Sequence, residues 1–290
     1  MEIGFIGLGN MGAPMARNLA AAGHAVTGYD VAGVRVEGVT AAASAAAAAA
    51  GREAVVTMLP DGAILRQVYD DIVPVGAAGA VFIDCSTIDV DRARAAAAQA
   101  EAAGLLAVDA PVSGGVGGAT AGTLTFMAGG SEAAFARAQP LFEVMGARAV
   151  HCGGAGAGQA AKICNNMLLG ISMIGACEAF MLAERLGLDA RALFDVVSTS
   201  SGSCWSVNTY CPVPGVGPTS PADNDYRPGF AATLMLKDLR LSQQAAGMAG
   251  AQTPLGAHAA DLYAAFVAED GAGRDFSAIL PWLGGKSRSA

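Results

Sequence analysis

Charged residues are scarce in this sequence, and positive charge is scarcer than negative. Charged side chains make up 14% of the 290 residues, and the formal net charge is -8. Nucleic acids are bound by clustered Lys and Arg, so this balance argues against a general nucleic-acid partner. An acidic protein can still bind a small anion where one pocket is locally positive.

Cysteine and histidine are few and do not lie at spacings that bind metals. None of the six cysteines forms a CxxC pair, and His24, His151 and His258 are far apart in the sequence. No signal peptide precedes the first expected strand, Glu2–Ile6. We therefore expect reduced thiols, a cytoplasmic location and no bound metal.

Long hydrophobic runs are also lacking. The longest, Met167–Cys177, is interrupted by Glu178, and it is shorter than the ~20 residues needed to span a bilayer. We expect a buried helix there and no membrane partner.

Apolar residues are abundant, and their pattern divides the chain. The hydrophobic fraction is 53%, enough for a sizeable core, and the length exceeds a typical single domain. Glu2–Ile6, a helix at Met11–Ala22 and Ala25–Tyr29 form a βαβ unit. Further strands are expected at Ala54–Met58, Ala80–Ile83, Leu105–Ala107 and Leu124–Ala128. This predicts a parallel, doubly wound α/β domain of Rossmann type over residues 1–160.

Strand signals nearly vanish after about residue 160. Helices are expected at Lys162–Leu186, Ala190–Ser198, Thr233–Gly247 and Leu255–Glu269. An irregular segment, Ser200–Phe230, lies among them, and a loop that long is uncommon unless it has a function. We predict an all-α domain over residues 161–290 for substrate binding and oligomerisation, joined to the first by a long helix. The alanine-rich stretches Ala41–Ala50 and Ala93–Ala103 predict helices that cover the sheet.

The segment GFIGLGNMG matches the GxGxxG pattern of dinucleotide-binding loops through Gly7, Gly9 and Gly12. The first glycine allows a tight turn, the second a close approach of pyrophosphate, and the third close packing of helix on strand. The helix that follows presents N–H groups and positive dipole to the phosphates. The expected cofactor-binding residues of this loop are Gly7, Leu8, Gly9, Asn10, Met11 and Gly12.

Asp30 follows the second strand at the distance expected for a ribose-binding carboxylate. Its charge would repel a 2′-phosphate, which favours NAD over NADP, although Arg35 could accommodate that phosphate. We expect NAD as the cofactor.

Ser113, Gly114 and Gly115 follow a strand that ends near Asp109. Exposed backbone N–H groups and a hydroxyl suit a substrate carboxylate, but the glycines could equally serve a turn of positive φ. The spacing alone does not decide between the two.

Lys162, Asn165 and Asn166 open the long predicted helix, and positions four apart share one face. A lysine whose pKa is lowered by burial or by a neighbouring cation can act as a general acid or base. A lone lysine more often extends to solvent, but adjacent asparagines in an apolar helix need partners that a substrate would provide.

Two other pairs have simpler structural interpretations. Lys237 and Asp238 lie in an apolar helix and could be a solvated charged pair. Trp205 and Tyr210 could line a pocket or anchor the irregular segment.

Taken together, these segments resemble the β-hydroxyacid dehydrogenase family over nearly the whole chain. The matching motifs are GFIGLGNMG, MLP at Met58–Pro60, DCSTID at Asp84–Asp89, DAPVSGG from Asp109, GQAAKICNNM, CWSVNTYCPVPGV at Cys204–Val216, LMLKDL, and DFS at Asp275–Ser277. The Cys204–Val216 motif resembles the hydroxyisobutyrate branch of the family. Gly4 in the first strand and the short, alanine-rich stretch from Asp30 to Val55 depart from the family pattern.

The resemblance implies NAD-dependent oxidation of a small 3-hydroxy acid to its semialdehyde, as in valine breakdown. Lys162 would be the acid/base, and Asn166 would orient the substrate hydroxyl. The substrate-binding residues would be Ser113, Gly114, Gly115, Trp205, Tyr210, Lys237 and Asp238. Leu59, Pro60, Thr87 and Lys237 would contact the cofactor. A homodimer or homotetramer built through the helical domain is also implied.

Three alternatives remain open at this point. One is a reductase of the same family that acts on tartronate, glyoxylate or succinic semialdehyde with NADPH. Imine reductases are a second, and they generally lack the lysine found here at Lys162. The third is a non-catalytic NAD-binding module.

Overall fold

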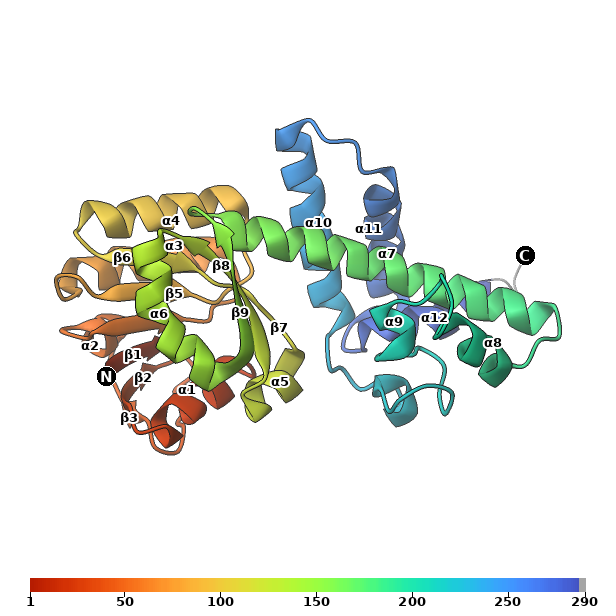
Figure 1. Cartoon of the computed structure of the whole chain (residues 1–290), viewed down its shortest axis with the longest axis horizontal. Coiled ribbons are helices and arrows are strands. Elements are labelled where there is room, and N and C mark those ends of the chain that lie inside the picture. The colour runs from red at the N-terminus through yellow and green to blue at the C-terminus, as the bar shows by residue number, and fades with distance from the viewer. Residues whose placement is uncertain (287–290) are drawn as a thin grey trace. The chain divides into compact units, whose positions relative to one another are not determined.

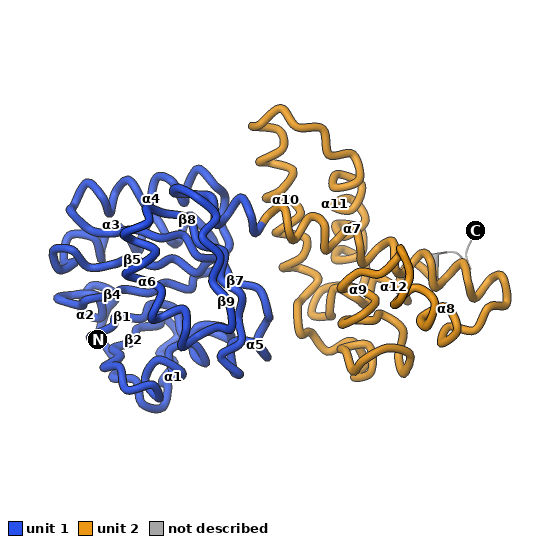
Figure 2. The backbone as a smooth tube through the Cα atoms, in the orientation of Figure 1, with its two compact units in different colours: residues 1–162 blue, residues 163–290 orange. Residues whose placement is uncertain are grey.

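In the computed structural model, which describes residues 1–286, the chain divides into two compact units. Unit 1 covers residues 1–162, and unit 2 begins at Ile163 (Figure 2). The boundary falls inside one long helix, α7 (Ala157–Arg185), which begins in unit 1 and continues into unit 2.

Unit 1 contains a nine-stranded sheet whose parallel part has the order β3-β2-β1-β4-β5-β6. The strands are β1 (Glu2–Ile6), β2 (Ala25–Tyr29), β3 (Thr40–Ala41), β4 (Ala54–Thr57), β5 (Val81–Asp84), β6 (Leu106–Asp109), β7 (Val112–Ser113), β8 (Leu124–Gly130) and β9 (Gly146–Gly153). In register, Ile3 of β1 lies between Val26 of β2 and Ala54 of β4. The strand order reverses between β1 and β4, which is where doubly wound sheets bind dinucleotides. The predicted Rossmann-type fold is confirmed.

The prediction of a wholly parallel sheet is wrong at one edge. β8 runs antiparallel to β6 and to β7, and β9 then pairs parallel with β8. A parallel crossover needs a dozen or more residues, and the chain between β7 and β8 is shorter than that. β3 and β7, of two residues each, and β9, of eight residues, were not predicted.

Helices cover both faces of this sheet (Figure 1). They are α1 (Gly12–Ala21), α2 (Ala45–Ala49), α3 (Gly62–Ile72), α4 (Val90–Ala102), α5 (Gly115–Ala121) and α6 (Glu132–Met145). α1 and α6 bury Met15, Leu19 and Phe142 against one face, whereas α3 buries Leu65 and Tyr69 on the other. α3, α5 and α6 were not predicted, and α2 is shorter than the alanine-rich stretch that suggested it.

Gly4 lets helix α2 lie unusually close to β1. A Cβ atom on Gly4 would be 2.5 Å from the carbonyl oxygen of Ala48 and 3.2 Å from the Cα atom of Ala49. Ala48 and Ala49 are fully buried, so small residues face each other on both elements. The two departures from the family pattern, Gly4 and the alanine-rich stretch, are therefore parts of one packing arrangement.

Unit 2 is helical in its described residues. Besides most of α7, it contains α8 (Ala190–Val197), α9 (Trp205–Asn208), α10 (Ala232–Ala249), α11 (Pro254–Phe266) and α12 (Ile279–Lys286), with a π turn at Val267–Gly271. Its core packs Tyr263, Phe266 and Phe276 against Met173 of α7 and Met235 of α10.

The long irregular segment of unit 2 is fastened by one buried carboxylate, that of Asp275. One of its oxygens accepts hydrogen bonds from the Tyr210 hydroxyl and the Gly229 and Phe230 N–H groups, at 2.9–3.0 Å. The other accepts from the N–H and hydroxyl of Ser277. Asp275 is fully buried, so its charge is stabilised by these donors instead of water.

Helix α7 begins at Ala157, one turn before the predicted start at Lys162. Non-local contacts described below stabilise this first turn. By length and composition α7 could cross a membrane, contrary to the expectation from the shorter run Met167–Cys177. Core helices that pack inside a protein meet the same criterion, and about half of its apolar part is buried within the described structure.

Two carboxylates, Asp84 and Asp109, are buried at the carboxyl ends of β5 and β6. They line a cavity of about 10 Å³ together with Tyr69, a space on the scale of one water molecule. Asp84 Oδ1 accepts hydrogen bonds from the hydroxyls of Thr57 and Ser86, whereas Oδ2 has no protein partner. Burial raises the pKa of both carboxyls to about 6.

We predict that Gly4→Ala destabilises the protein. The added Cβ would overlap backbone atoms of α2, and overpacking of this kind costs about 1–3 kcal/mol in the free energy of unfolding. Gly247→Ala is a matched control, because a Cβ there meets no atom within 4 Å and alanine favours the helix. Denaturant unfolding of both variants tests this, and equal stability for the two would contradict the packing argument.

A second prediction concerns pH. The Asp84 carboxyl has a folded-state pKa of about 6 against 3.8 unfolded, so the folded state retains its proton to higher pH. Stability is therefore lost as pH rises through this window, by up to ~3 kcal/mol for the one group. Asp84→Asn removes this loss, and its free energy of unfolding should fall less than that of the wild type between about pH 4 and pH 7. Asp91→Asn on the exposed surface of α4 is the control. Parallel profiles for wild type and Asp84→Asn would rule out the predicted titration.

Candidate functional site

The turn between β1 and α1 has the geometry of a phosphate-binding loop. Gly7 has φ +93°, and a Cβ on it would lie 2.2 Å from the Met58 carbonyl oxygen. A Cβ on Gly12 would lie 1.9 Å from the carbonyl oxygen of Gly7. Gly9, in contrast, has no atom within 4 Å of its Cβ position. Gly7 and Gly12 therefore close the turn, and Gly9 leaves its backbone open to a ligand.

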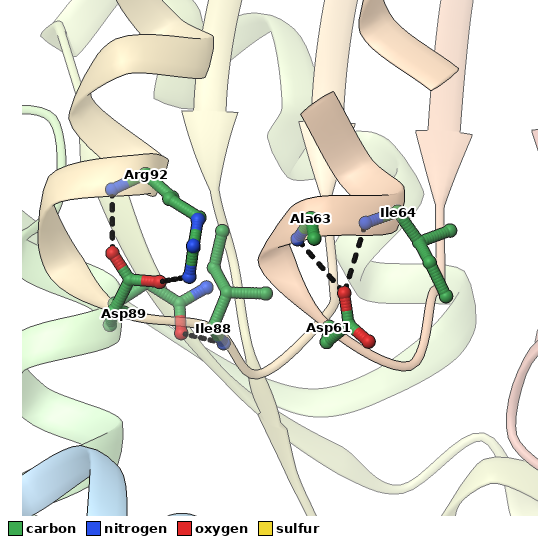
Figure 3. Close-up of polar contacts among 7 residues, drawn as sticks. Asp61, Ala63, Ile64, Ile88, Asp89 and Arg92 are labelled. Carbon is green, nitrogen blue, oxygen red and sulfur yellow. Dashed lines mark hydrogen bonds and ion pairs between the residues drawn. The ribbon is translucent and has the colours of Figure 1, made fainter. Parts of the chain in front are cut away.

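The N-terminus of α1 differs from most helix starts of unit 1. Four of the six helices α1–α6 have a side-chain cap, provided by Ser44, Asp61, Asp89 and Ser131. Figure 3 shows Asp61 bonded to the N–H groups of Ala63 and Ile64, and Asp89 bonded to Arg92. Within the described unit 1, only α1 and α5 among these six lack such a cap. These two helices follow the two glycine-rich segments, so their N–H groups can serve a bound anion.

Asp30 lies beside the glycine loop. Its Oδ2 accepts a hydrogen bond of 2.7 Å from the N–H of Leu8, and its Oδ1 accepts one of 2.8 Å from Ala32. Each oxygen has further lone pairs that can accept hydrogen bonds from ribose hydroxyls. Arg35 is exposed on the following segment.

The loops after β4 and β5 are joined to each other and to the glycine turn. The N–H of Leu59 donates a hydrogen bond of 2.8 Å to the Ser86 hydroxyl, and the Leu59 side chain lies 3.2 Å from the Cβ position of Gly7. Pro60 is exposed at this point, and Thr87 follows Ser86 with its side chain partly exposed. The structure thus places the predicted cofactor-binding residues of three loops at the carboxyl ends of adjacent strands.

Ser113 lies on β7, and Gly114 and Gly115 lead into α5. Gly114 has φ +132° and Gly115 has φ +60°, so both glycines adopt the positive φ that a turn at this point requires. α5 lies beside α1, because the Asn18 amide donates a hydrogen bond of 2.8 Å to the Ala119 carbonyl. The two helices without side-chain caps are therefore neighbours.

The predicted acid/base residue, Lys162, lies on the second turn of α7 and is 7% exposed. The first turn is capped by Asp109, which accepts hydrogen bonds from the N–H groups of Gly156 and Gln159 at 2.7 and 2.8 Å. Asn166 follows one turn after Lys162 and is 1% exposed. Lys162 and Asn166 are therefore both buried and lie one turn apart along α7.

In unit 2, Asn166 is bonded directly to Asp238 of α10. Its amide donates a hydrogen bond of 2.5 Å to Asp238 Oδ2, and the Lys237 Nζ atom lies 3.7 Å from Asp238 Oδ1. Asp238 is 3% exposed, whereas about a third of the Lys237 side chain is exposed. Lys237 and Asp238 are therefore not the solvated pair that their sequence alone suggested.

Trp205 and Tyr210 stack on each other, with ring centroids 4.8 Å apart. The Tyr210 hydroxyl donates to Asp275, and burial together with that carboxylate raises the pKa of Tyr210. About half of Trp205 is exposed, so one ring offers an open face and the other fixes it. The ring contacts and the hydrogen bond of this pair are made to residues other than Asn166 and Asp238.

Sequence reasoning missed Asp109 and Gln159 as functional candidates. Both lie inside motifs that were noticed, DAPVSGG and GQAAKICNNM, but neither has a residue type that points to catalysis. A carboxylate at a strand end and an amide near a helix start are signals for capping, which needs the three-dimensional partner to be recognised.

Comparison with known families accounts for almost the whole chain. Residues 2–154 match the NAD-binding domain of 6-phosphogluconate dehydrogenase, and residues 156–283 match the NAD-binding domain of NADP-dependent 3-hydroxyisobutyrate dehydrogenase.

Individual relatives agree with these matches over their full length. The chain is 52% identical over 286 residues to a probable 3-hydroxyisobutyrate dehydrogenase of Mycobacterium tuberculosis, covering 97% of each protein. It is 48% identical to the 3-hydroxyisobutyrate dehydrogenase of Pseudomonas aeruginosa, covering 98% of this chain and 99% of the relative. An NAD-dependent L-serine dehydrogenase of Pseudomonas aeruginosa is 45% identical, with 96% of both covered.

Solved structures show the same relationship. The Mycobacterium tuberculosis 3-hydroxyisobutyrate dehydrogenase with L-serine has a TM-score of 0.93 and 52% identity, covering 97% of this chain and 98% of that one. A Streptomyces aurantiacus imine reductase has a TM-score of 0.59 and 19% identity over 97% of this chain and 99% of that one, so it shares the fold alone. The chain belongs to the 3-hydroxyisobutyrate dehydrogenases of the β-hydroxyacid dehydrogenase family, and it is an NAD-dependent oxidoreductase.

Proposed function

We propose that this enzyme oxidises 3-hydroxyisobutyrate to methylmalonate semialdehyde with NAD, using Lys162 as the general acid/base. The observation that carries the proposal is the buried Lys162 one turn before Asn166, whose amide is held by Asp238. The near full-length relatives named for this substrate support the same assignment.

The residues of unit 1 fit the cofactor. In our proposal the backbone around Gly9 and the start of α1 bind the pyrophosphate, and Asp30 binds the adenosine ribose. Leu59, Pro60 and Thr87 line the path toward the nicotinamide. When bound, NAD supplies the hydride acceptor, so the protein has to provide orientation and proton transfer.

Lys162 is suited to take the proton of the substrate hydroxyl. Lys162 is 7% exposed on the second turn of α7, so its amine is held in place to accept that proton. Ser113, Gly114 and Gly115 would bind the substrate carboxylate through the hydroxyl and backbone N–H groups. Lys237 would add positive charge that balances that carboxylate.

Asn166 would orient the substrate hydroxyl, and Asp238 would orient Asn166. The Asn166 amide nitrogen donates to Asp238, and its carbonyl oxygen accepts a hydrogen bond of 2.9 Å from the Asn165 amide. An amide oxygen has two lone pairs, so the second can accept from the substrate hydroxyl. This assigns the amide a defined orientation before substrate binds, which is the condition for efficient catalysis by positioning.

L-serine is the second candidate substrate, because it also carries a hydroxyl on carbon 3 of a carboxylic acid. One relative is named for it, and one solved relative contains it. The two substrates differ in an apolar methyl against a charged ammonium at carbon 2. The Trp205–Tyr210 stack offers an aromatic face that can pack against the methyl or attract the ammonium, so it does not discriminate between them. The relatives named for 3-hydroxyisobutyrate, at 52% and 48% identity, favour that substrate.

We also propose that the enzyme functions in valine breakdown in the cytoplasm, as a homodimer or homotetramer. Exposed apolar side chains on α7, just after it and on α8 support self-association: Leu182, Leu186 and Val196 are 60–75% exposed. Unit 2 would then serve in both substrate binding and assembly.

Initial rates on a substrate panel test the function directly. We expect one enantiomer of 3-hydroxyisobutyrate with NAD to give the highest kcat/KM, ahead of 3-hydroxypropionate, both enantiomers of serine, glycerate and 4-hydroxybutyrate. A higher value for L-serine would move the enzyme to the serine branch. Activity only with NADP on a semialdehyde would indicate a reductase, and no turnover of any acid would indicate a non-catalytic module.

Lys162→Ala should lower kcat by ~10²–10⁴-fold, the usual contribution of a positioned acid/base. NADH binding, followed by its fluorescence, should be retained because the lysine is not part of the nucleotide loop. Glu184→Ala on the exposed part of the same helix is the control. Unchanged turnover in Lys162→Ala would remove this lysine from the mechanism.

Asp30→Asn should weaken the preference for NAD. The variant keeps an oxygen for the Leu8 N–H but loses the charge that repels a 2′-phosphate. We expect the ratio of kcat/KM for NAD over NADP to fall at least about tenfold, corresponding to ~1.4 kcal/mol. Glu37→Gln, an exposed acid on the same segment, controls for the change in net charge. An equal effect of both variants would show that Asp30 does not read the ribose.

A further inference from the structure

Gln159 is a fully buried amide whose two ends bind the same loop. Its Nε2 donates a hydrogen bond of 2.7 Å to the Ser86 carbonyl, and its Oε1 accepts one of 3.1 Å from the Ile88 N–H. The bond from Ile88 is drawn in Figure 3. These partners lie immediately before and after Thr87, so a single side chain brackets that residue. A buried amide satisfied at both ends has one orientation, and it fixes the loop that it holds.

The backbone of Gln159 is anchored equally firmly. Its N–H donates to Asp109, and a Cβ on the preceding residue, Gly158, would lie 2.2 Å from the Met127 carbonyl oxygen. A Cβ on Gly129 of β8 would lie 2.7 Å from the Gly158 nitrogen. Helix α7 therefore begins with its backbone pressed against β6 and β8, and the position of Gln159 is set by the sheet.

Lys162 follows Gln159 by three residues, so the two lie about one helical turn apart. The loop that Gln159 brackets is also joined to the loop after β4, because the Ser86 hydroxyl accepts from the Leu59 N–H. Gln159 is thus a direct link between the residues proposed to line the nicotinamide path and the helix that carries the proposed acid/base.

Oxidation of an alcohol requires that proton removal and hydride removal occur on one substrate in one geometry. An error of about 1 Å between the two acceptors can cost ~10²-fold in rate. We propose that Gln159 is a positioning residue that sets the distance between the nicotinamide and the Lys162 amine by locking the Ser86–Ile88 loop to the first turn of α7. This inference rests on the proposed function of Lys162 and extends it to a residue that contacts neither substrate nor cofactor.

The test compares Gln159→Met, which keeps the side-chain length but not the hydrogen bonds, with Gln139→Met on the exposed surface of α6. In Gln159→Met we expect kcat to fall ~10–10²-fold while the KM for NAD changes less than about threefold, since the nucleotide loop is untouched. The deuterium isotope effect on kcat with substrate labelled at carbon 3 should rise, because hydride transfer becomes slower. Gln139→Met should match the wild type in all three.

A measurement without turnover separates this proposal from the proposed function. In the cofactor-free protein, hydrogen exchange of the Ile88 amide should be faster in Gln159→Met than in the wild type. In the complex with NADH, the emission of the bound NADH should shift, while the Kd for NADH is retained. Exchange and emission as in the wild type would overturn the inference, whether or not the wild type oxidises any acid. If the wild type turned over none of the substrates, that result would count against the proposed function alone.

Gln159→Glu guards against a variant that merely unfolds. Its carboxylate can still accept from Ile88 but repels the Ser86 carbonyl, whereas the protonated acid can donate to that carbonyl and restore both bonds. Burial favours the protonated form, so the kcat of Gln159→Glu relative to wild type should rise as pH is lowered from about 8 to about 6. A constant ratio, with both variants folded, would contradict the positioning role.

Discussion

The contact between the first turn of α7 and the ends of β6 and β8 determines much of the remaining structure. Backbone lies against backbone there because Gly129 and Gly158 have no side chains, and the buried Asp109 carboxylate bonds two of the helix N–H groups. The position of the first turn of α7, and with it that of Lys162, is therefore fixed by the sheet of unit 1. A carboxylate buried for this purpose loses hydration, which is reflected in its raised pKa, and the helix dipole and two N–H groups compensate part of that loss.

Helix caps distinguish structural from ligand-binding helix starts in unit 1. Where a helix start has only to be stable, as in α3 and α4, an aspartate satisfies its N–H groups. Where glycine-rich chain leads into the helix, as in α1 and α5, no side chain does so in the described unit. These two uncapped helix starts belong to neighbouring helices, because Asn18 of α1 bonds the Ala119 carbonyl of α5.

The parts of the fold that could be predicted are those fixed by local pattern. β1 and β2 matched to the residue, because apolar strands next to a GxGxxG turn carry their own signal. The start of α7 was placed too late, since its first turn depends on Asp109, a residue distant in sequence. The same reason applies to the candidate site. Lys162 and Asn166 could be singled out from their spacing on one predicted helix. The hydrogen bonds from Asn166 to Asp238 and from Ile88 to Gln159 could not be predicted, because each joins residues more than 70 positions apart. The sequence therefore predicts which residue types lie close together along one element, but not which residues distant in sequence form hydrogen bonds.

The buried carboxylate of Asp275 has a consequence for how this enzyme family can diversify. One side chain bonds both Tyr210, inside the long segment, and Gly229 and Phe230 at its C-terminal end, so that part of the segment is held although most of it is neither helix nor strand. Outward-facing residues such as Trp205 can then change without loosening the fold, since none of the bonds to Asp275 comes from them. Loss of the Asp275 carboxylate, in contrast, would leave the Tyr210 hydroxyl and the Gly229 and Phe230 N–H groups without their acceptor.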